Sequence, residues 1–238
     1  MNINDVELTT TDGPARGYEV LPPGAPTGAV IIVPEAFGLN DHIEGVARRF
    51  AGAGFAALGV DIFHRSGNST APYDDFRKVM ALFEGLDDAG QLADVDAAIA
   101  HLAARGFPAH MVGIVGFCIG GRTAFLAALR RSLGAAVSYY GGSIVSQGPF
   151  PALLPLLEEA AGLATPWLGL FGDLDKSNPP VEVELLGEAV ARASVDHEIV
   201  RYPDADHGFN CDARPAFNAE ASDAAFVRSV DWLQRHLQ

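Results

Sequence analysis

The sequence is 238 residues long, with 49% hydrophobic and 19% charged residues, which predicts a globular chain with a well-buried core. Its 16 Lys and Arg residues against 30 Asp and Glu residues give a formal net charge of −14 at pH 7. This charge repels phosphate backbones and anionic lipid surfaces, so we expect neither a nucleic-acid partner nor a membrane partner. No internal repeat or linker divides the chain, which favours a single domain over residues 1–238.

The N-terminus lacks a basic region followed by an apolar stretch, and no run approaches the roughly 20 apolar residues that span a bilayer. We therefore expect a cytoplasmic protein. The two cysteines, Cys118 and Cys211, are expected to stay unpaired in such a reducing compartment.

In chain order, the first expected element is an antiparallel hairpin, because two alternating segments, 6–10 and 16–20, flank an Asp-Gly pair. After it, apolar runs that predict buried strands alternate with periodic segments that predict helices. The predicted strands are 29–33, 55–61, 111–115, 135–140, 167–171 and 197–202. The predicted helices lie at 40–52, 73–86, 88–105, 121–131, 153–160 and 180–193, with a closing helix around 226–237.

This alternation indicates an α/β fold with a mostly parallel central sheet of about eight strands and helices on both faces. In such sheets the chemistry lies at the carboxyl ends of the strands. The loops that follow residues 33, 115, 171 and 202 are therefore the candidate site loops.

The most informative motif is Gly116-Phe117-Cys118-Ile119-Gly120-Gly121, between an apolar run and a helical pattern. It predicts a strand, a sharp turn and a helix, as in a nucleophile elbow, where small residues must stand two before and two after the reactive one. The helix N-terminus would favour a thiolate at Cys118. The alternative is that Cys118 is a buried small hydrophobe, as many free cysteines are. The motif does not match Gly-x-Gly-x-x-Gly, so no dinucleotide cofactor is expected.

A candidate base is His207, in the loop after the last predicted strand, although a lone loop histidine is often only a surface residue. Asp173 and Asp175 both follow the preceding strand, and each could orient the base or be an ordinary turn residue. The order Cys118, Asp175, His207 is nucleophile, acid and base, which is the order in α/β-hydrolases.

Six segments share the pattern of one known family: Pro34-Glu35-Ala36-Phe37-Gly38-Leu39-Asn40, Val60-Asp61-Ile62-Phe63, the motif around Cys118, Tyr139-Tyr140-Gly141, Gly172-x-x-Asp175 and His207-Gly208-Phe209. In them the sequence resembles the dienelactone hydrolase family over nearly its full length. The resemblance implies an α/β-hydrolase fold and a cysteine-dependent hydrolase. It would cleave a small ester or lactone, of the carboxymethylenebutenolide kind, through a thioester acyl-enzyme.

The resemblance further implies a catalytic triad of Cys118, Asp175 and His207. It favours Asp175 over Asp173, because the family's acid is the last residue of Gly-x-x-Asp. It also assigns Glu35 as a partner of the resting cysteine that helps to activate the thiol when substrate arrives.

The oxyanion hole implied by the resemblance consists of the backbone N–H groups of Ala36 and Ile119. The residues expected to bind substrate are Phe37, Tyr73, Arg77 and Phe209.

The chain departs from the family where family members hold a substrate carboxylate with two arginines. By local alignment Tyr73 takes the first of these places and Cys211 the second. Arg77 or Arg214 could substitute, and the alternative for both is an ordinary solvated position. The resemblance therefore supports the reaction class more strongly than the dienelactone substrate.

Two other functions compete with this one. The first is a non-catalytic or redox-sensing protein that uses Cys118 as a reactive thiol and joins it to Cys211 on oxidation. The second is a metal-dependent hydrolase that uses His42, His64, Asp206 and His207, but these residues lack zinc-site spacing, so no metal is expected. For the favoured hydrolase we expect no cofactor, and a monomer or a homodimer.

Overall fold

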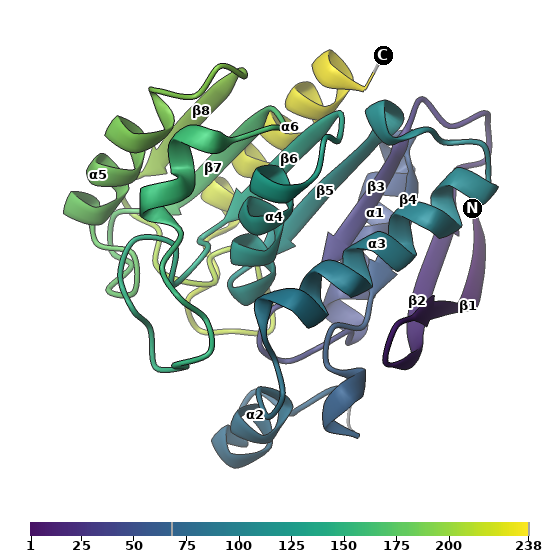
Figure 1. Cartoon of the computed structure of the whole chain (residues 1–238), viewed down its shortest axis with the longest axis horizontal. Helices are drawn as coiled ribbons and strands as arrows, with labels where there is room; N and C mark the ends of the chain where they lie inside the picture. Colours follow the sequence, from purple (N-terminus) through teal and green to yellow (C-terminus); the bar gives the residue numbers. More distant parts are fainter. Residues whose placement is uncertain (68, 238) are drawn as a thin grey trace.

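The structure is a computed structural model that describes residues 1–67 and 69–237. In these residues eight strands form one sheet in the order β1-β2-β4-β3-β5-β6-β7-β8 (Figure 1). The strands are β1 (Asn2–Thr10), β2 (Gly13–Leu21), β3 (Ala29–Val33), β4 (Ala56–Val60), β5 (Val112–Phe117), β6 (Ala135–Tyr139), β7 (Trp167–Gly172) and β8 (His197–Tyr202). β2 pairs antiparallel with β1 and β4, and the other neighbours are parallel. The mostly parallel sheet predicted from the sequence is confirmed.

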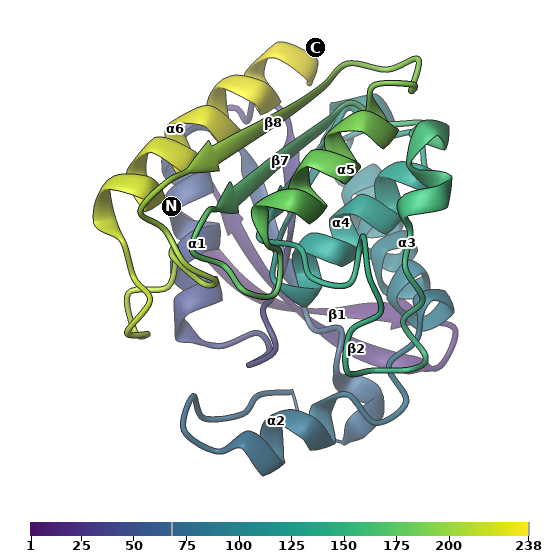
Figure 2. The same cartoon turned by 90° about the vertical axis from the view of Figure 1, so that its left-hand side faces the viewer.

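Helices cover both faces of the sheet, as Figure 2 shows edge-on. On one face lie α1 (Asp41–Gly52) and α6 (Ala219–His236), and on the other lie α3 (Asp88–Ala104), α4 (Ile119–Arg130) and α5 (Pro180–Val190). The short helix α2 (Phe76–Leu82) projects from the body of the molecule. Three 3₁₀ turns complete the elements: η1 (His64–Ser66), η2 (Ala109–Met111) and η3 (Leu157–Gly162).

The central strands are apolar on both sides because each side of the sheet has its own core. In β3, Ile31 and Val33 pack into the core beneath α3 and α4, whereas Val30 and Ile32 pack into the core beneath α1 and α6. All four side chains are completely buried. The continuous apolar run that predicted this strand is thus explained by a sheet with two covered faces.

Two predicted helices differ from the observed ones. The helix expected over 73–86 is confined to α2, because Asp75 caps its start by accepting from the Lys78 N–H and the chain turns at Gly85 with a φ of 79°. The helix expected over 153–160 is replaced by η3, which begins after Pro155. Pro155 disfavours the helical conformation at the residue before it, Leu154, so a helix does not start at 153.

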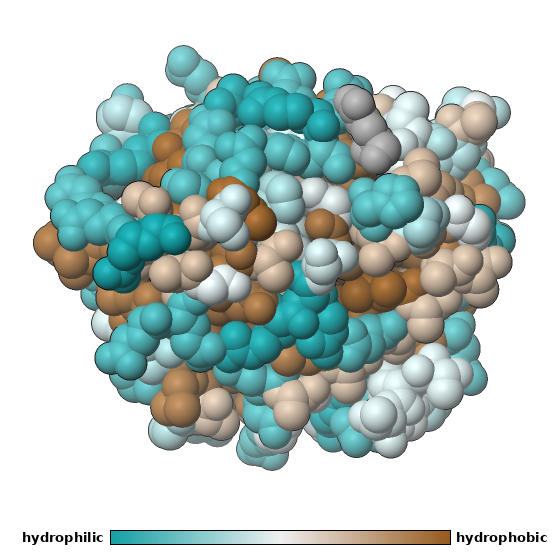
Figure 3. Space-filling view, turned by 45° about the horizontal axis from the view of Figure 1, so that its top comes forward, coloured by the Kyte–Doolittle hydropathy of each residue, from teal (hydrophilic) through white to brown (hydrophobic). Residues whose placement is uncertain are grey.

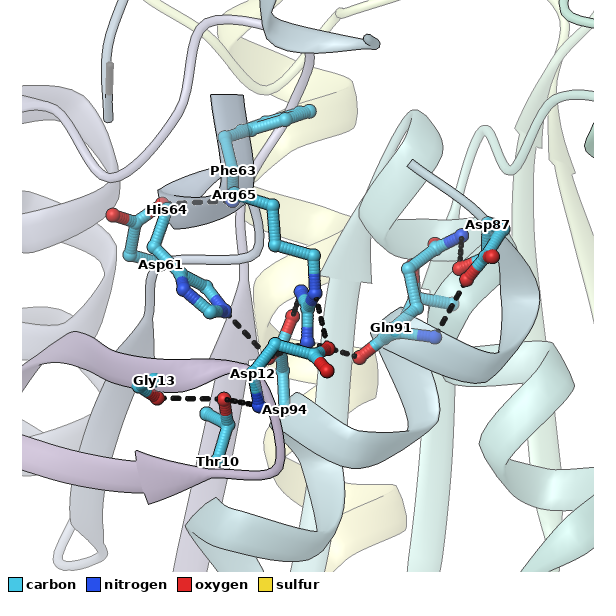
Figure 4. Close-up of polar contacts among 12 residues, drawn as sticks. Thr10, Asp12, Gly13, Asp61, Phe63, His64, Arg65, Asp87, Gln91 and Asp94 are labelled. Carbon is cyan, nitrogen blue, oxygen red and sulfur yellow. Dashed lines mark hydrogen bonds and ion pairs between the residues drawn. The ribbon is translucent and has the colours of Figure 1, made fainter. Parts of the chain in front are cut away.

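A cluster of ion pairs around the buried Asp94 ties the β1–β2 turn to α3 (Figure 4). Asp94 of α3 is completely buried and accepts hydrogen bonds from both Nη atoms of Arg65, at 2.8 and 2.9 Å. His64 Nε2 lies 3.0 Å from the same carboxylate, and Arg65 Nε donates to Asp12 in the hairpin turn at 2.7 Å. The cluster therefore fixes the segment that leaves β4 against two other parts of the fold.

On the face drawn in Figure 3, hydrophobic residues occur in small groups between hydrophilic ones. Among the described residues, no helix combines the length and the apolar character needed to cross a membrane.

Candidate active site

Cys118 stands at the turn between β5 and α4, in a backbone conformation that non-glycine residues rarely adopt. Its φ is 54° and its ψ is −116°. The glycines on either side allow this turn: a Cβ at Gly116 would lie 1.8 Å from the Gly120 carbonyl oxygen, and one at Gly120 would lie 2.4 Å from the Val33 carbonyl oxygen. α4 can lie this close to β5 at Gly116, and to the end of β3 at Gly120, only because both positions lack a side chain.

Three side chains from the ends of three strands form a continuous hydrogen-bonded chain. The Cys118 Sγ lies 3.1 Å from His207 Nε2, and His207 Nδ1 lies 2.8 Å from Asp175 Oδ2. Cys118 follows β5, Asp175 follows β7 and His207 follows β8, so the parallel strands bring the three together at one edge of the sheet. This is the arrangement in which an imidazole can take a proton from a thiol while a carboxylate orients it.

The structure distinguishes between the two candidate acids. Asp173 is partly exposed and accepts a hydrogen bond from Arg201 Nε at 2.6 Å. Asp175 is 1% exposed and is the carboxylate that contacts His207. The family pattern and the geometry therefore select the same residue.

The charges of this chain of residues stabilise one another. Burial alone would raise the pKa of Asp175, but the hydrogen bond and the charge of His207, with the Asn178 amide and the Ser177 N–H, lower it below its usual value. Burial alone would lower the pKa of His207, but the charge of Cys118 and the hydrogen bond to Asp175 raise it well above its usual value. The site therefore favours the charged imidazolium form of His207 and the ionised form of Asp175.

Glu35, in the loop after β3, is 2% exposed and is held by two side chains. Its Oε1 accepts a hydrogen bond from the Tyr140 hydroxyl at 3.0 Å and lies 3.5 Å from Arg214 Nη1. Burial and the nearby Glu35 charge raise the pKa of Tyr140 well above its usual value, so this hydroxyl stays protonated and donates. In the described residues the hydrogen-bond partner of the Cys118 thiol is thus His207, whereas Glu35 contacts Tyr140 and Arg214.

Ala36 and Ile119, the predicted oxyanion donors, lie at the two segments that meet around Cys118. Ile119 is the first residue of α4, so its N–H belongs to the turn of the helix that has no carbonyl partner within the helix. Ala36 follows Glu35 and is partly buried.

Aromatic residues surround Glu35 and His207. The centroids of the Phe37 and Tyr73 rings lie 4.5 Å apart, and the Arg214 guanidinium carbon lies over the Phe37 ring, 5.3 Å from its centroid. The Ala71 N–H donates to the Phe37 carbonyl at 3.2 Å, which ties the segment before α2 to the Glu35 loop. Of the four predicted substrate-binding residues, Phe37 and Tyr73 are therefore in mutual contact.

The other two predicted substrate-binding residues differ from each other. Phe209 is completely buried, and its ring centroid lies 5.1 Å from that of Tyr140. It therefore supports the Tyr140 ring. Arg77 is exposed on the projecting helix α2, and none of the described contacts places it beside Cys118. Arg214, by contrast, is beside Glu35.

Cys211 is buried, and its Sγ lies 3.4 Å from the Tyr73 hydroxyl. Burial and the Glu35 charge raise the pKa of Cys211, which keeps it a neutral thiol. Burial, followed by the contact with Cys211, also raises the pKa of Tyr73. Both cysteines are free thiols.

The residues proposed for a metal site take separate partners. His64 contacts Asp94, His207 contacts Asp175, and His42 Nδ1 lies 3.6 Å from Asp212. Within residues 1–67 and 69–237, no group of three or more His, Cys, Asp or Glu side chains could hold a metal ion.

Sequence reasoning gave no role to two residues that the structure places in the site, Tyr140 and Asn178. Tyr140 is the first residue after the strand β6, and Asn178 lies three residues beyond Asp175. A polar residue at the carboxyl end of a strand was the available signal for Tyr140. Asn178 gave no comparable signal, because its role depends on a contact with Tyr140, far away in the chain.

Comparisons with known proteins identify the family and the fold of this chain. The sequence model of the dienelactone hydrolase family matches residues 15–237. A Yersinia pestis protein named "Putative carboxymethylenebutenolidase" is 35% identical over 99% of this chain and 91% of its own length. A Bradyrhizobium protein named "Probable 2-oxo-3-(5-oxofuran-2-ylidene)propanoate lactonase" is 32% identical over 88% of this chain and 84% of its own length. The crystal structure of "Putative Dienelactone Hydrolase" from Klebsiella pneumoniae superposes with a TM-score of 0.89, at 32% identity and 98% coverage of both chains.

Proposed function

The chain belongs to the dienelactone hydrolase family of α/β-hydrolases, and from that premise we propose that it cleaves a small ester or lactone with Cys118 as nucleophile. The observation that carries the proposal is the unbroken contact from Cys118 through His207 to Asp175, at 3.1 and 2.8 Å. A thiol so placed has a base within reach, and the base has a carboxylate that fixes its orientation.

In the proposed reaction the Cys118 thiolate attacks the substrate carbonyl carbon and forms a tetrahedral oxyanion. The oxyanion collapses to a thioester as the carbon–oxygen bond to the leaving group breaks, and His207 gives its proton to that oxygen. Water then attacks the thioester with His207 as base, and the Cys118 thiolate is released. Asp175 keeps the imidazole oriented and stabilises its positive charge in both halves.

The proposed oxyanion hole consists of the N–H groups of Ala36 and Ile119. Two N–H donors fixed before the reaction stabilise the developing negative charge without reorganisation, which is commonly worth ~3 kcal/mol for each donor. Glu35 is the proposed additional carboxylate of the site. Because Tyr140 and Arg214 hold it, it is available to the thiol only when these contacts rearrange.

We assign the substrate to small esters and lactones because the Bradyrhizobium relative is named as a lactonase and the Yersinia relative as a carboxymethylenebutenolidase. The side chains near Glu35 include two aromatic rings, Phe37 and Tyr73, and one cation, Arg214. Arg214 is the candidate partner for a substrate carboxylate, because it is partly exposed and lies beside Glu35. Arg77 is less suited to this role from its exposed position on α2.

The test is steady-state hydrolysis of cis-dienelactone, trans-dienelactone and p-nitrophenyl acetate by the wild type, Cys118→Ala and Cys211→Ala. We expect Cys118→Ala to abolish turnover and Cys211→Ala, the matched control, to retain it. Brief incubation with p-nitrophenyl acetate should leave one acetyl group on the peptide that contains Cys118. Full activity in Cys118→Ala, or no turnover of any of these compounds by the wild type, would contradict the proposal. Peroxide-dependent joining of Cys118 to Cys211 in an inactive wild type would instead support the thiol sensor.

A further inference from the structure

Asn178 lies beside the acid of the site, in the loop between β7 and α5. It is 6% exposed, and Asp175, three residues earlier, is 1% exposed. The Asn178 side-chain Nδ2 donates to Asp175 Oδ2 at 2.8 Å, and the same Nδ2 donates to the Tyr140 carbonyl oxygen at 3.3 Å. One buried amide group therefore joins the carboxylate to the backbone at the end of β6.

The amide completes the set of donors around Asp175. Its Oδ1 accepts from the N–H groups of Ser177 and Asn178, at 2.7 and 3.3 Å, and its Oδ2 accepts from His207 and from the Asn178 amide. A carboxylate offers about four acceptor sites, so this one is fully occupied. The two backbone donors would be present in an ordinary turn, whereas the side-chain amide reaches the oxygen that also holds His207.

The other end of the amide contact is a strained residue. Tyr140 has a φ of 38°, which is unfavourable for a residue with a side chain, and its N–H donates to the Leu170 carbonyl at 2.8 Å. Its ring packs 5.1 Å from the His207 ring, and its hydroxyl donates to Glu35. Tyr140 therefore touches both the base and the second carboxylate of the site.

We propose that Asn178 is a positioning residue that fixes Asp175 and Tyr140 relative to each other, and through them orients the His207 ring toward Cys118. The proposal rests on the function proposed above. Asn178 touches neither the thiol nor the substrate. Its amide holds the acid at the distance at which His207 can contact both partners, and it holds the turn that carries the Tyr140 ring against that imidazole.

The first test compares Asn178→Ala and the isosteric Asn178→Asp with Ser177→Ala. Both Asn178 variants lose the amide donor, and the Asp variant keeps its shape but adds a like charge beside Asp175. Because a hydrogen bond to a charged group is lost, we expect kcat to fall about tenfold or more in both, with KM within about twofold of the wild type. Ser177→Ala keeps its backbone N–H and should match the wild type. An unchanged kcat in both folded Asn178 variants would overturn the proposal.

The second test does not depend on ester turnover. It follows alkylation of Cys118 by iodoacetamide at pH 7, measured by mass spectrometry on its peptide, so that Cys211 does not interfere. A misplaced His207 stabilises less thiolate, so Asn178→Ala should be alkylated several-fold more slowly than Ser177→Ala. If the wild type hydrolyses no ester yet this difference appears, the proposed function fails and the positioning role stands. If turnover is present and the alkylation rates are equal, the positioning role fails alone.

Discussion

Gly208 lies directly beneath the guanidinium of Arg214, so that a Cβ at 208 would stand 2.1 Å from Nη1. The same glycine has a φ of 83°, a conformation that strains other residues. The residue that follows the proposed base therefore also defines where the cation beside Glu35 can lie.

Gly208→Ala should displace Arg214 and strain the turn. We expect the free energy of unfolding to fall by ~1 kcal/mol or more. Relative to wild type, KM should rise more for a carboxylate-bearing lactone than for p-nitrophenyl acetate. Gly85→Ala is the control, because Gly85 has a similar φ of 79° but nothing within 4 Å of its Cβ position. Equal effects of the two substitutions on KM would argue against a role of the Arg214 contact in binding.

The elbow glycine Gly116 should tolerate no side chain. Its Cβ would overlap backbone atoms of the following helix rather than a flexible side chain, so the strand and α4 would have to separate. We expect Gly116→Ala to lower the free energy of unfolding by ~4 kcal/mol or more, measured by urea denaturation. Gly142→Ala, where nothing lies within 4 Å, should change it by less than ~1 kcal/mol.

Two aspartates of α3 should differ sharply in their contribution to stability. Asp94 is completely buried against Arg65 and His64 (Figure 4), whereas Asp96 is about half exposed and pairs with Arg131 at the surface. Asp94→Ala removes the buried carboxylate that accepts two hydrogen bonds from Arg65 and contacts His64, and it should cost ~3–5 kcal/mol. Asp96→Ala should cost less than ~1 kcal/mol, because solvent screens the surface pair. Similar urea midpoints for the two variants would contradict this difference.

The proposed base should make stability depend on pH in a defined direction. The pKa of His207 is raised well above 6.5, so its charged form stabilises the fold. This stabilisation is complete below the unfolded-state pKa of about 6.5 and is lost as the pH rises through the folded-state pKa. The difference in free energy of unfolding between wild type and His207→Gln should therefore shrink toward alkaline pH. A difference that does not vary with pH would show that the imidazole is not held as an imidazolium.

Local patterns in the sequence predicted most of the fold because they record burial. The apolar run of β3 indicates that both faces of the sheet are covered, and the glycines around Cys118 indicate a close approach of strand and helix. Composition and periodicity gave the wrong element where a single residue decides, as at Pro155, which disfavours the helical conformation at Leu154.

For the candidate site, residue spacing and the family resemblance pointed to Cys118, Asp175 and His207, which the structure brings into contact. They did not point to Asn178, because its significance lies in a contact with the Tyr140 carbonyl 38 residues away. Every residue has a backbone carbonyl, so the sequence does not indicate which carbonyl a distant side chain will contact. Such a contact is found only in the folded structure.

The order of the strands has a consequence for how the protein is made. Cys118 leaves the ribosome 89 residues before His207, and the strand that carries His207 into place, β8, is at the edge of the sheet and pairs with β7. A nascent chain can fold its central strands and display the thiol while the imidazole is still unsynthesised. The proposed chemistry is thus withheld until the last strand docks, so hydrolytic activity would report completion of the C-terminal part of the fold.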